Sequence, residues 1–160
     1  LPKHEAPDLP ITADRQIPVS WTDYNGHMNE THYLEAGSLA TDRFMELIGA
    51  DADYIASGKS YFTIETHVRY LSELHAGDRL TIRTQVLKGE GKKLHLFHFL
   101  YGPDDTLAAT VETLLLHVDL TTRASSLPDQ AVAEKLGVYH QAHAALEQPE
   151  GAGRSVGQKA

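Results

Sequence analysis

Residues 23–29 read Asp-Tyr-Asn-Gly-His-Met-Asn and stand directly before a long amphipathic segment. The Asn-Gly pair tolerates positive φ at low cost, so it predicts a tight turn. Asn29 is a preferred N-cap residue, and a helix is expected to begin there. The same turn carries the carboxylate of Asp23 and the imidazole of His27, which neither a turn nor a cap requires. We therefore interpret residues 23–29 as a candidate catalytic turn at the start of a helix.

The segment that follows has the periodicity of a helix over about residues 29–48. Its apolar and small residues recur at steps of three and four and form one stripe: Tyr33, Gly37, Ala40, Phe44, Leu47 and Ile48. The two small residues in this stripe predict that the helix lies close against a sheet. Gly49 is expected to end the helix as the residue after the C-cap.

The rest of the chain has the period of β-strands. An apolar segment at 17–22 predicts a first strand, and four more are expected at 61–70, 80–87, 94–101 and 107–120. The short loops among the last four are typical of an antiparallel meander. Residues 1–15 predict an irregular N-terminal arm, residues 129–146 a C-terminal helix, and the Gly-rich residues 148–160 a disordered tail. The expected fold is a single α+β domain over residues 16–147, with a curved antiparallel five-stranded sheet around one long central helix.

Composition narrows the functional classes. The chain has 160 residues, enough for one domain with a real core, and a formal net charge of −8, which argues against nucleic acid as a partner. It has no cysteine, which excludes disulfides and thiolate chemistry. No apolar run is long enough to span a bilayer and no signal peptide is visible, so we expect a cytoplasmic protein with no membrane partner. One helix cannot cover a five-stranded sheet, which predicts a homodimer or higher homo-oligomer built through the sheet.

The motif and the order of the elements resemble those of a known family. Residues 23–34 are similar to the Asp-x-Asn-x-His-x-Asn…Tyr pattern of hotdog-fold thioesterases, including acyl-ACP thioesterases and the 4-hydroxybenzoyl-CoA thioesterase-like group. The longer string at residues 21–30, Trp-Thr-Asp-Tyr-Asn-Gly-His-Met-Asn-Glu, resembles betainyl-CoA thioesterases found beside, or fused to, carnitine dehydrogenases. The resemblance implies a hotdog fold and hydrolysis of a small acyl-CoA, with betainyl-CoA as the candidate substrate. It also implies that coenzyme A enters only as part of the substrate, and that the chain is fused to, or acts with, a carnitine dehydrogenase.

Thioester hydrolysis requires an activated nucleophile and a group that stabilises the carbonyl oxygen. Asp23 is the candidate general base or direct nucleophile, and the sequence leaves both roles open. Asn25 is a candidate to hold the water or the carbonyl. His27 is expected to orient Asp23 or to protonate the leaving thiolate. The resemblance also implies a further acid after the helix, for which Glu73 and Glu65 are the candidates.

The turn and the helix start also predict an oxyanion site. Backbone N–H groups near Gly26, His27 and Met28, together with the helix end at Asn29, are expected to face the developing negative charge.

Aromatic residues cluster around the motif and the first long strand. Four of them are candidates to bind the acyl group, and a trimethylammonium head would favour their faces: Trp21, Tyr24, Tyr33 and Tyr61.

Ten histidines suggest a metal, but their spacing argues against one. His95 and His98 are three apart on a strand and face opposite ways. His140 and His143 share a helix face but have no third ligand nearby in sequence. Zinc usually needs three or four convergent ligands, so no metal is expected.

Two other functions fit the expected fold. A hotdog hydratase also uses Asp and His after the first strand, but its pattern is Asp-x-Asn-Pro-x-His, whereas His27 is four residues after Asp23 and no proline follows Asn25. A non-catalytic module that binds an acyl group or only dimerises is the second alternative. The intact set of Asp, Asn and His argues against it.

Overall fold

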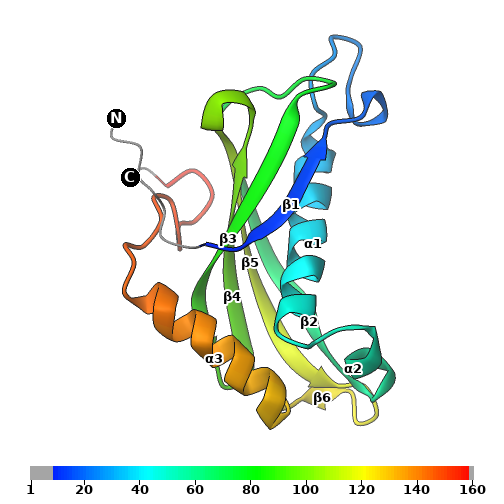
Figure 1. Ribbon diagram of the computed structural model, residues 1–160, viewed down its shortest axis with the longest axis vertical. Coiled ribbons are helices and arrows are strands. Elements are labelled where there is room, and N and C mark those ends of the chain that lie inside the picture. Colours follow the sequence, from blue (N-terminus) through cyan, green and yellow to red (C-terminus); the bar gives the residue numbers. More distant parts are fainter. Residues whose placement is uncertain (1–8, 159–160) are drawn as a thin grey trace.

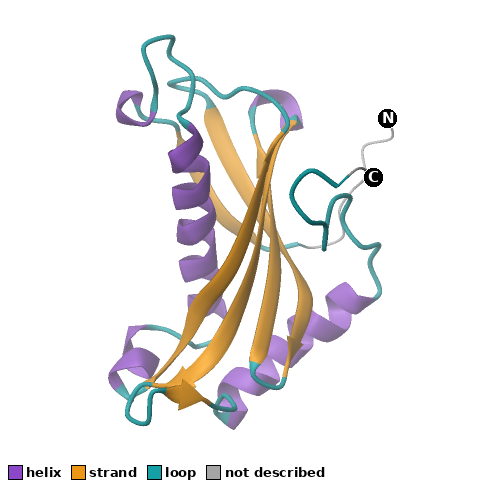
Figure 2. Cartoon of the chain, turned by 180° about the vertical axis from the view of Figure 1, so that it is seen from behind, coloured by secondary structure: helices purple, strands orange, loops and turns teal. Residues whose placement is uncertain are grey.

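A long helix lies along the concave side of a curved antiparallel sheet (Figures 1 and 2). The computed structural model describes residues 9–158. It contains five long strands and three α-helices. Their order along the chain is β1 (Ile11–Gln16), α1 (Glu30–Leu47), α2 (Ala52–Ala56), β2 (Lys59–Tyr70), β3 (Arg79–Glu90), β4 (Lys93–Tyr101), β5 (Leu107–Asp119) and α3 (Gln130–Ala144). A two-residue strand, β6 (Ala124–Ser125), pairs with the end of β5, and short 3-10 helices occupy Val19–Trp21 and Pro103–Asp105. This arrangement confirms the predicted α+β fold of one curved five-stranded sheet around a central helix.

Local sequence sets both ends of α1 and its distance from the sheet. The Asn29 side chain accepts a hydrogen bond from the Thr31 amide, and Gly49 has a φ of 83° just after the C-cap. Gly37 lies against Val111 of β5, and a Cβ at this position would come within 2.7 Å of the Val111 side chain. The helix and the sheet can approach this closely because residue 37 has no side chain. The expectation of close helix–sheet packing is thus confirmed.

The strand order differs from the predicted meander. The order across the sheet is β1-β3-β4-β5-β2, so β2 pairs with β5 and is not a neighbour of β3. Residues 71–78 therefore cross the end of the sheet from one side to the other instead of forming a hairpin. A connection of eight residues is longer than most hairpin loops, and this one carries the candidate acid Glu73. The edge of β2 away from β5 is free among the described residues.

The first strand lies earlier than predicted. Residues 17–22 are not a strand, because Pro18 opens the 3-10 helix Val19–Trp21. The strand is Ile11–Gln16, within the segment expected to be an irregular arm, while residues 1–8 of that arm lie outside the described residues. Its single buried residue is Thr12, so the strand lacks the apolar alternation that marks the others. It pairs only with the first half of β3.

A bulge changes the inward face of β2. The pairing with β5 shifts between Thr63 and Glu65, which leaves Ile64 unpaired. Tyr61 is buried before the bulge, whereas Phe62 and Ile64 are exposed. A single alternation over residues 61–70 was therefore the wrong prediction, because the bulge resets which side chains face the helix.

The C-terminal third of the chain covers parts of the sheet that the other elements leave open. α3 packs on β3 beyond the end of β1, and His143 accepts a hydrogen bond from the Val86 amide at 2.8 Å. Burial lowers the pKa of His143, which keeps the ring neutral and able to accept this bond. The predicted helix at 129–146 is confirmed within two residues at each end.

The predicted disorder of residues 148–160 is wrong for residues 148–158, which the structure places on the sheet's outer face. The Gly153 amide donates to both carboxylate oxygens of Glu112 at 3.0 Å, and His67 Nδ1 lies 3.1 Å from the Arg154 carbonyl oxygen. Polar contacts of this kind leave no apolar pattern in the sequence, which is why the tail resembled a disordered segment. Residues 159–160 lie outside the described residues.

A chain of buried polar side chains crosses the sheet near its centre. Thr12 donates to the Ile82 carbonyl oxygen, and its hydroxyl lies 2.9 Å from that of Thr84. His98 Nδ1 then lies 2.7 Å from the Thr84 hydroxyl, and His98 Nε2 lies 2.8 Å from that of Thr41 on α1. Complete burial lowers the pKa of His98 to about 3, so this ring is neutral.

Candidate functional site

The candidate catalytic turn is held together by the Asp23 carboxylate. Asp23 Oδ1 accepts hydrogen bonds from the Asn25 amide at 2.9 Å and the His27 amide at 3.1 Å. Gly26 has a φ of 76°, as expected for the Asn-Gly turn. Asp23 Oδ2 has no partner among the described residues, and the side chain is exposed. One carboxylate oxygen therefore shapes the turn, and the other is left to react with water or a substrate.

The crossing segment between β2 and β3 lies against this turn, at the top of Figure 1. His27 and His75 form an antiparallel backbone bridge. The Met28 amide donates to the Leu74 carbonyl oxygen at 2.7 Å, and the Ala76 amide donates to the Gly26 carbonyl oxygen at 3.2 Å. Two segments that are nearly 50 residues apart in the sequence thus form one small polar surface.

Glu73 is the acid that this contact brings to the turn. Its Oε2 atom lies 3.3 Å from His27 Nε2, and both side chains are accessible to solvent. Glu65 lines a small cavity on the outer face of the sheet together with His67 and Glu112, away from the turn. Between the two candidates for a second acid, only Glu73 lies beside His27.

His75 is a member of this cluster that the sequence analysis missed. Its ring lies edge-on to that of His27, with 4.8 Å between the ring centroids. No local pattern marks His75, because its position depends on the crossing connection. An eight-residue link between strands was the one available signal that this segment differs from a hairpin.

The predicted amide donors for an oxyanion are already used within the turn. Gly26 donates to the Asp23 carbonyl oxygen, His27 to Asp23 Oδ1, and Met28 to the Leu74 carbonyl oxygen. The prediction of these three amides as free donors is therefore wrong, since Asp23 accepts the first two bonds within the turn and the crossing segment accepts the third. Asn29 acts as the N-cap, as predicted. The Glu30 amide, the first of α1, has no acceptor within residues 9–158 and is the donor that remains at this helix end.

The four aromatic candidates do not gather in one place. Trp21 is buried, with His32 stacked on its ring at 5.3 Å and the Arg15 guanidinium 4.1 Å from the ring centroid. Tyr33 packs edge-on against Tyr70, and Tyr24 is fully exposed at the tip of the turn. Of the four, only Tyr61 lines the cavity that lies beside α1.

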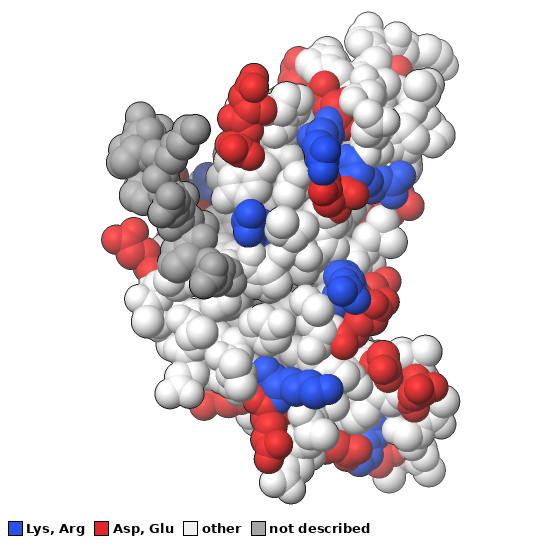
Figure 3. All heavy atoms as spheres, viewed as in Figure 1, with Lys and Arg blue, Asp and Glu red and all other residues white. Residues whose placement is uncertain are grey.

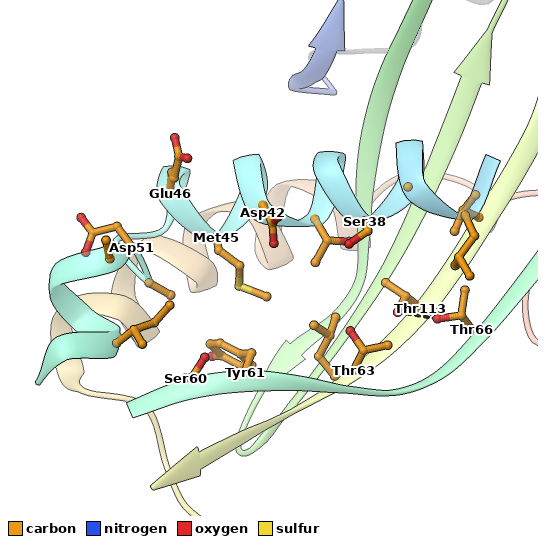
Figure 4. Close-up of a pocket in the computed structure, with 18 residues that line it drawn as sticks. Ser38, Asp42, Met45, Glu46, Asp51, Ser60, Tyr61, Thr63, Thr66 and Thr113 are labelled. Atoms are coloured by element: carbon orange, nitrogen blue, oxygen red, sulfur yellow. Dashed lines mark hydrogen bonds between the residues drawn. The ribbon is translucent and has the colours of Figure 1, made fainter. Parts of the chain in front are cut away.

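That cavity has a volume of about 640 Å³ and lies between α1, α2 and the strands β2 and β5 (Figure 4). Apolar parts of its wall come from Leu34, Met45 and Leu115. Tyr61 is buried in its floor, and the Tyr61 hydroxyl is the one buried side-chain polar atom of the described residues without a hydrogen-bond partner. Burial raises the pKa of this phenol, so it stays neutral. An unpaired buried hydroxyl in a cavity is unfavourable unless a ligand or a water molecule forms a hydrogen bond with it.

The charges around the cavity are of one sign. Its lining includes Asp42, Glu46 and Asp51, and none of the described residues that line it is Lys, Arg or His. In Figure 4 the Asp42 side chain points from α1 into the cavity, while Glu46 points away from it. Desolvation raises the pKa of Asp42 because it disfavours the charged carboxylate, and the nearby Glu46 raises it further by repulsion between like charges. A cation in the cavity would relieve this cost.

The cavity and the candidate catalytic turn share no residue. The turn precedes Glu30, whereas the cavity extends from Leu34 to residues beyond the C-terminal end of the helix. Within one chain, Asp23 therefore faces solvent and is not part of the cavity wall. The face drawn in Figure 3 has acidic and basic side chains interspersed, without an extended basic patch. No helix within residues 9–158 has the length and apolar character needed to cross a membrane.

Comparison with known proteins agrees with this architecture. Residues 17–136 match the model of the thioesterase-like superfamily. The chain belongs to this superfamily. Its motif turn, central helix and all five long strands except β1 fall within the matched residues.

Relatives with sequence similarity over nearly the whole chain carry more specific names. A Ruegeria pomeroyi protein, the L-carnitine dehydrogenase/betainyl-CoA thioesterase, is 52% identical over 98% of this chain, which spans 32% of that protein's length. The betainyl-CoA thioesterase of Pseudomonas aeruginosa is 40% identical, over 98% of this chain and 94% of its own length. A Staphylococcus aureus protein solved in complex with CoA aligns with a TM-score of 0.87 and 26% identity, over 94% of this chain and 97% of its own. The chain thus spans about a third of the dehydrogenase fusion and nearly all of the stand-alone relative.

Proposed function

We propose that this chain hydrolyses acyl-CoA thioesters, and that its substrate is betainyl-CoA, whose acyl group carries a trimethylammonium head. The observation that carries this proposal is the acidic cavity with its buried aromatic floor. A quaternary ammonium group is bound by aromatic faces and by nearby negative charge. Tyr61 and Asp42 offer both in one cavity. The names of the Ruegeria and Pseudomonas relatives support the same substrate.

Hydrolysis in this proposal starts at the free Oδ2 atom of Asp23. This oxygen either removes a proton from a water that attacks the thioester carbonyl, or attacks the carbonyl itself to form an anhydride that water then cleaves. The oxygen of the carbonyl becomes negative in either route and is stabilised by the Glu30 amide and the end of α1. His27, held by Glu73 at 3.3 Å, orients the reacting groups or protonates the departing CoA thiolate, and Asn25 holds the water or the carbonyl. The products are glycine betaine and CoA, and no cofactor is needed beyond the CoA within the substrate.

A homodimer would bring the turn and the cavity together. The free edge of β2 carries the exposed apolar side chains of Phe62 and Ile64, and Leu34 and Ile55 are exposed beside it. An exposed strand edge of this kind is a template for pairing with a second copy. Antiparallel pairing of two β2 strands about a two-fold axis places the start of one α1 beside the end of the other. Asp23 of each subunit would then face the cavity of its partner, which accounts for their separation within a single chain.

The proposal also includes a partner enzyme. The Ruegeria relative joins a carnitine dehydrogenase and a thioesterase in one protein, which supports action of this domain with a carnitine dehydrogenase. We propose the cytoplasm as its compartment.

A pair of substrates with the same acyl shape tests the proposal. Betainyl-CoA and 3,3-dimethylbutanoyl-CoA differ in having a quaternary nitrogen or a carbon at one position, so their sizes match and their charges differ. A cation–π contribution of about 2 kcal/mol in the transition state corresponds to a kcat/KM about thirty-fold higher for betainyl-CoA. Steady-state hydrolysis of both thioesters measures this ratio. Equal values would remove the assignment to betainyl-CoA and leave a general acyl-CoA thioesterase.

Asp42→Asn should reduce this preference. The variant keeps the shape of the side chain but removes the negative charge that points into the cavity. We expect kcat/KM for betainyl-CoA to fall about tenfold, since a partly desolvated charge pair contributes roughly 1–2 kcal/mol, while the neutral thioester is unaffected. Asp53→Asn, which removes a charge from α2 outside the cavity wall, is the matched control. A parallel fall for both substrates would mean that Asp42 shapes the cavity rather than recognising charge.

A further inference from the structure

Three metal-binding side chains converge beside the candidate catalytic turn. One donor atom from each of His27, Glu73 and His75 lies within 4.8 Å of the other two, and His27 Nε2 is 3.3 Å from Glu73 Oε2. Ligands bonded to zinc at about 2.0–2.1 Å in a tetrahedron lie roughly 3.4 Å apart. The His27–Glu73 pair already has this spacing. His75, whose side chain is half-exposed, has a donor atom within 4.8 Å of both and must move closer to reach this spacing.

The backbone holds these three residues in place. His27 and His75 face one another across the antiparallel bridge, and two further amide bonds, from Met28 to Leu74 and from Ala76 to Gly26, fix the crossing segment to the turn. The cluster therefore comes from two paired segments of the fold and not from neighbouring residues of one flexible loop. Such pre-organisation reduces the entropic cost of binding an ion.

The chemistry of the donors points to a transition metal. Two imidazoles and one carboxylate suit Zn²⁺ and its neighbours, whereas Mg²⁺ and Ca²⁺ prefer oxygen ligands. His75 also has an outer partner, as many metal-bound histidines do. Asp78 Oδ2 accepts a hydrogen bond from the His75 amide at 2.8 Å and lies 3.5 Å from His75 Nδ1. The Asp78 carboxylate is thus placed to orient the ring and to leave Nε2 for the ion.

We propose that His27, Glu73 and His75 bind one Zn²⁺ ion and that this ion reversibly inhibits the enzyme. Zinc occupies the imidazole of His27 and the carboxylate of Glu73, so neither can act during hydrolysis. The inhibition rests on the proposed thioesterase function, whereas the binding of zinc does not. His75 takes no part in the proposed reaction, which allows the two roles of this cluster to be separated.

Calorimetric titration of the chelator-treated protein with ZnSO₄ tests the site directly. The wild-type chain should bind about one ion saturably, and MgSO₄ should not bind. His75→Phe keeps an aromatic ring against His27 and leaves the backbone bridge intact, but removes one ligand. It should weaken zinc binding at least about tenfold. His140→Ala, which removes a histidine on α3 away from the turn, is the control and should bind like the wild type. Equal affinity in His75→Phe, or no binding to the wild type, overturns the site.

Hydrolysis is then followed by the loss of thioester absorbance, because the CoA thiol itself binds zinc. Zinc should suppress the wild-type rate at the concentration that saturates the calorimetric site, and EDTA should restore it. Measured against its own zinc-free rate, His75→Phe should require at least about tenfold more zinc for the same inhibition. Zinc that binds with the expected stoichiometry but leaves the rate unchanged refutes the inhibition. A chain that hydrolyses no thioester refutes the proposed function, while the calorimetry still decides the metal site.

Discussion

Asp23→Asn is expected to lower kcat for betainyl-CoA at least ~10²-fold, which corresponds to roughly 2.7 kcal/mol of transition-state stabilisation. The amide oxygen of Asn can still accept the hydrogen bonds that Asp23 Oδ1 receives from the amides of Asn25 and His27. The turn should therefore keep its shape, while the second oxygen is replaced by an NH₂ group that can neither accept a proton nor attack a carbonyl. Steady-state kinetics and thermal unfolding measure the two effects separately.

Asp23→Ala is the companion variant. It removes the reactive oxygen and also the acceptor that shapes the turn, so it should lose both turnover and thermal stability. Unchanged turnover in Asp23→Asn would move the catalytic role to another residue, and Glu73, the acid beside His27, would be the next to replace.

Loss of the β2 edge contact is expected to abolish turnover, because the proposed site needs two subunits. Phe62→Lys together with Ile64→Lys places two charges on the free edge of β2, where a paired strand would bury them. Light scattering should show a folded monomer, and hydrolysis should be undetectable. Val138→Lys, at an exposed apolar position of α3, is the matched control and should remain dimeric and active. A fully active monomer would show that each chain holds a complete site.

Mixing of two inactive variants tests the shared site without breaking the dimer. Asp23→Asn lacks the reactive oxygen, and Ser38→Trp fills the cavity from an exposed position on α1. In a mixed dimer, one site combines the intact Asp23 of one subunit with the intact cavity of the other. Random exchange makes half of the dimers mixed, so about a quarter of the wild-type activity should return. No recovery after verified exchange would mean that turn and cavity act within the same chain.

The parts of the fold that depend on local sequence were predictable. The central helix, its Asn29 cap and the Gly49 end follow from periodicity and capping, which involve residues close in the chain. β1 was not found, because it buries only one side chain and has mostly polar residues. The placement of β2 beside β5 was also missed, since the sequence of residues 71–78, which connect β2 to β3, does not show which strands these two pair with.

The residues of the candidate site also divide into those that a local motif reveals and those that only long-range contacts bring together. Asp23, Asn25 and His27 share one turn, so a short motif was enough to find them. The contact between His27 and Glu73, and the presence of His75, depend on the crossing segment. The acidic cavity depends on which faces of α1 and β2 meet, and the bulge at Ile64 altered that face.

In the buried chain of hydroxyls and imidazole that ends at Thr41, the donor of each hydrogen bond can be assigned. Thr12 gives its proton to the Ile82 carbonyl oxygen, so Thr84 must give its own to Thr12 and accept one from His98 Nδ1. The neutral His98 then has a bare Nε2, to which Thr41 donates. The Thr41 proton is thereby committed to the protein interior, so Thr41 presents only oxygen lone pairs to the cavity. In the proposed complex this oxygen would attract the positively polarised N-methyl groups of a betainyl head and could not donate a hydrogen bond to an acyl carbonyl or carboxylate.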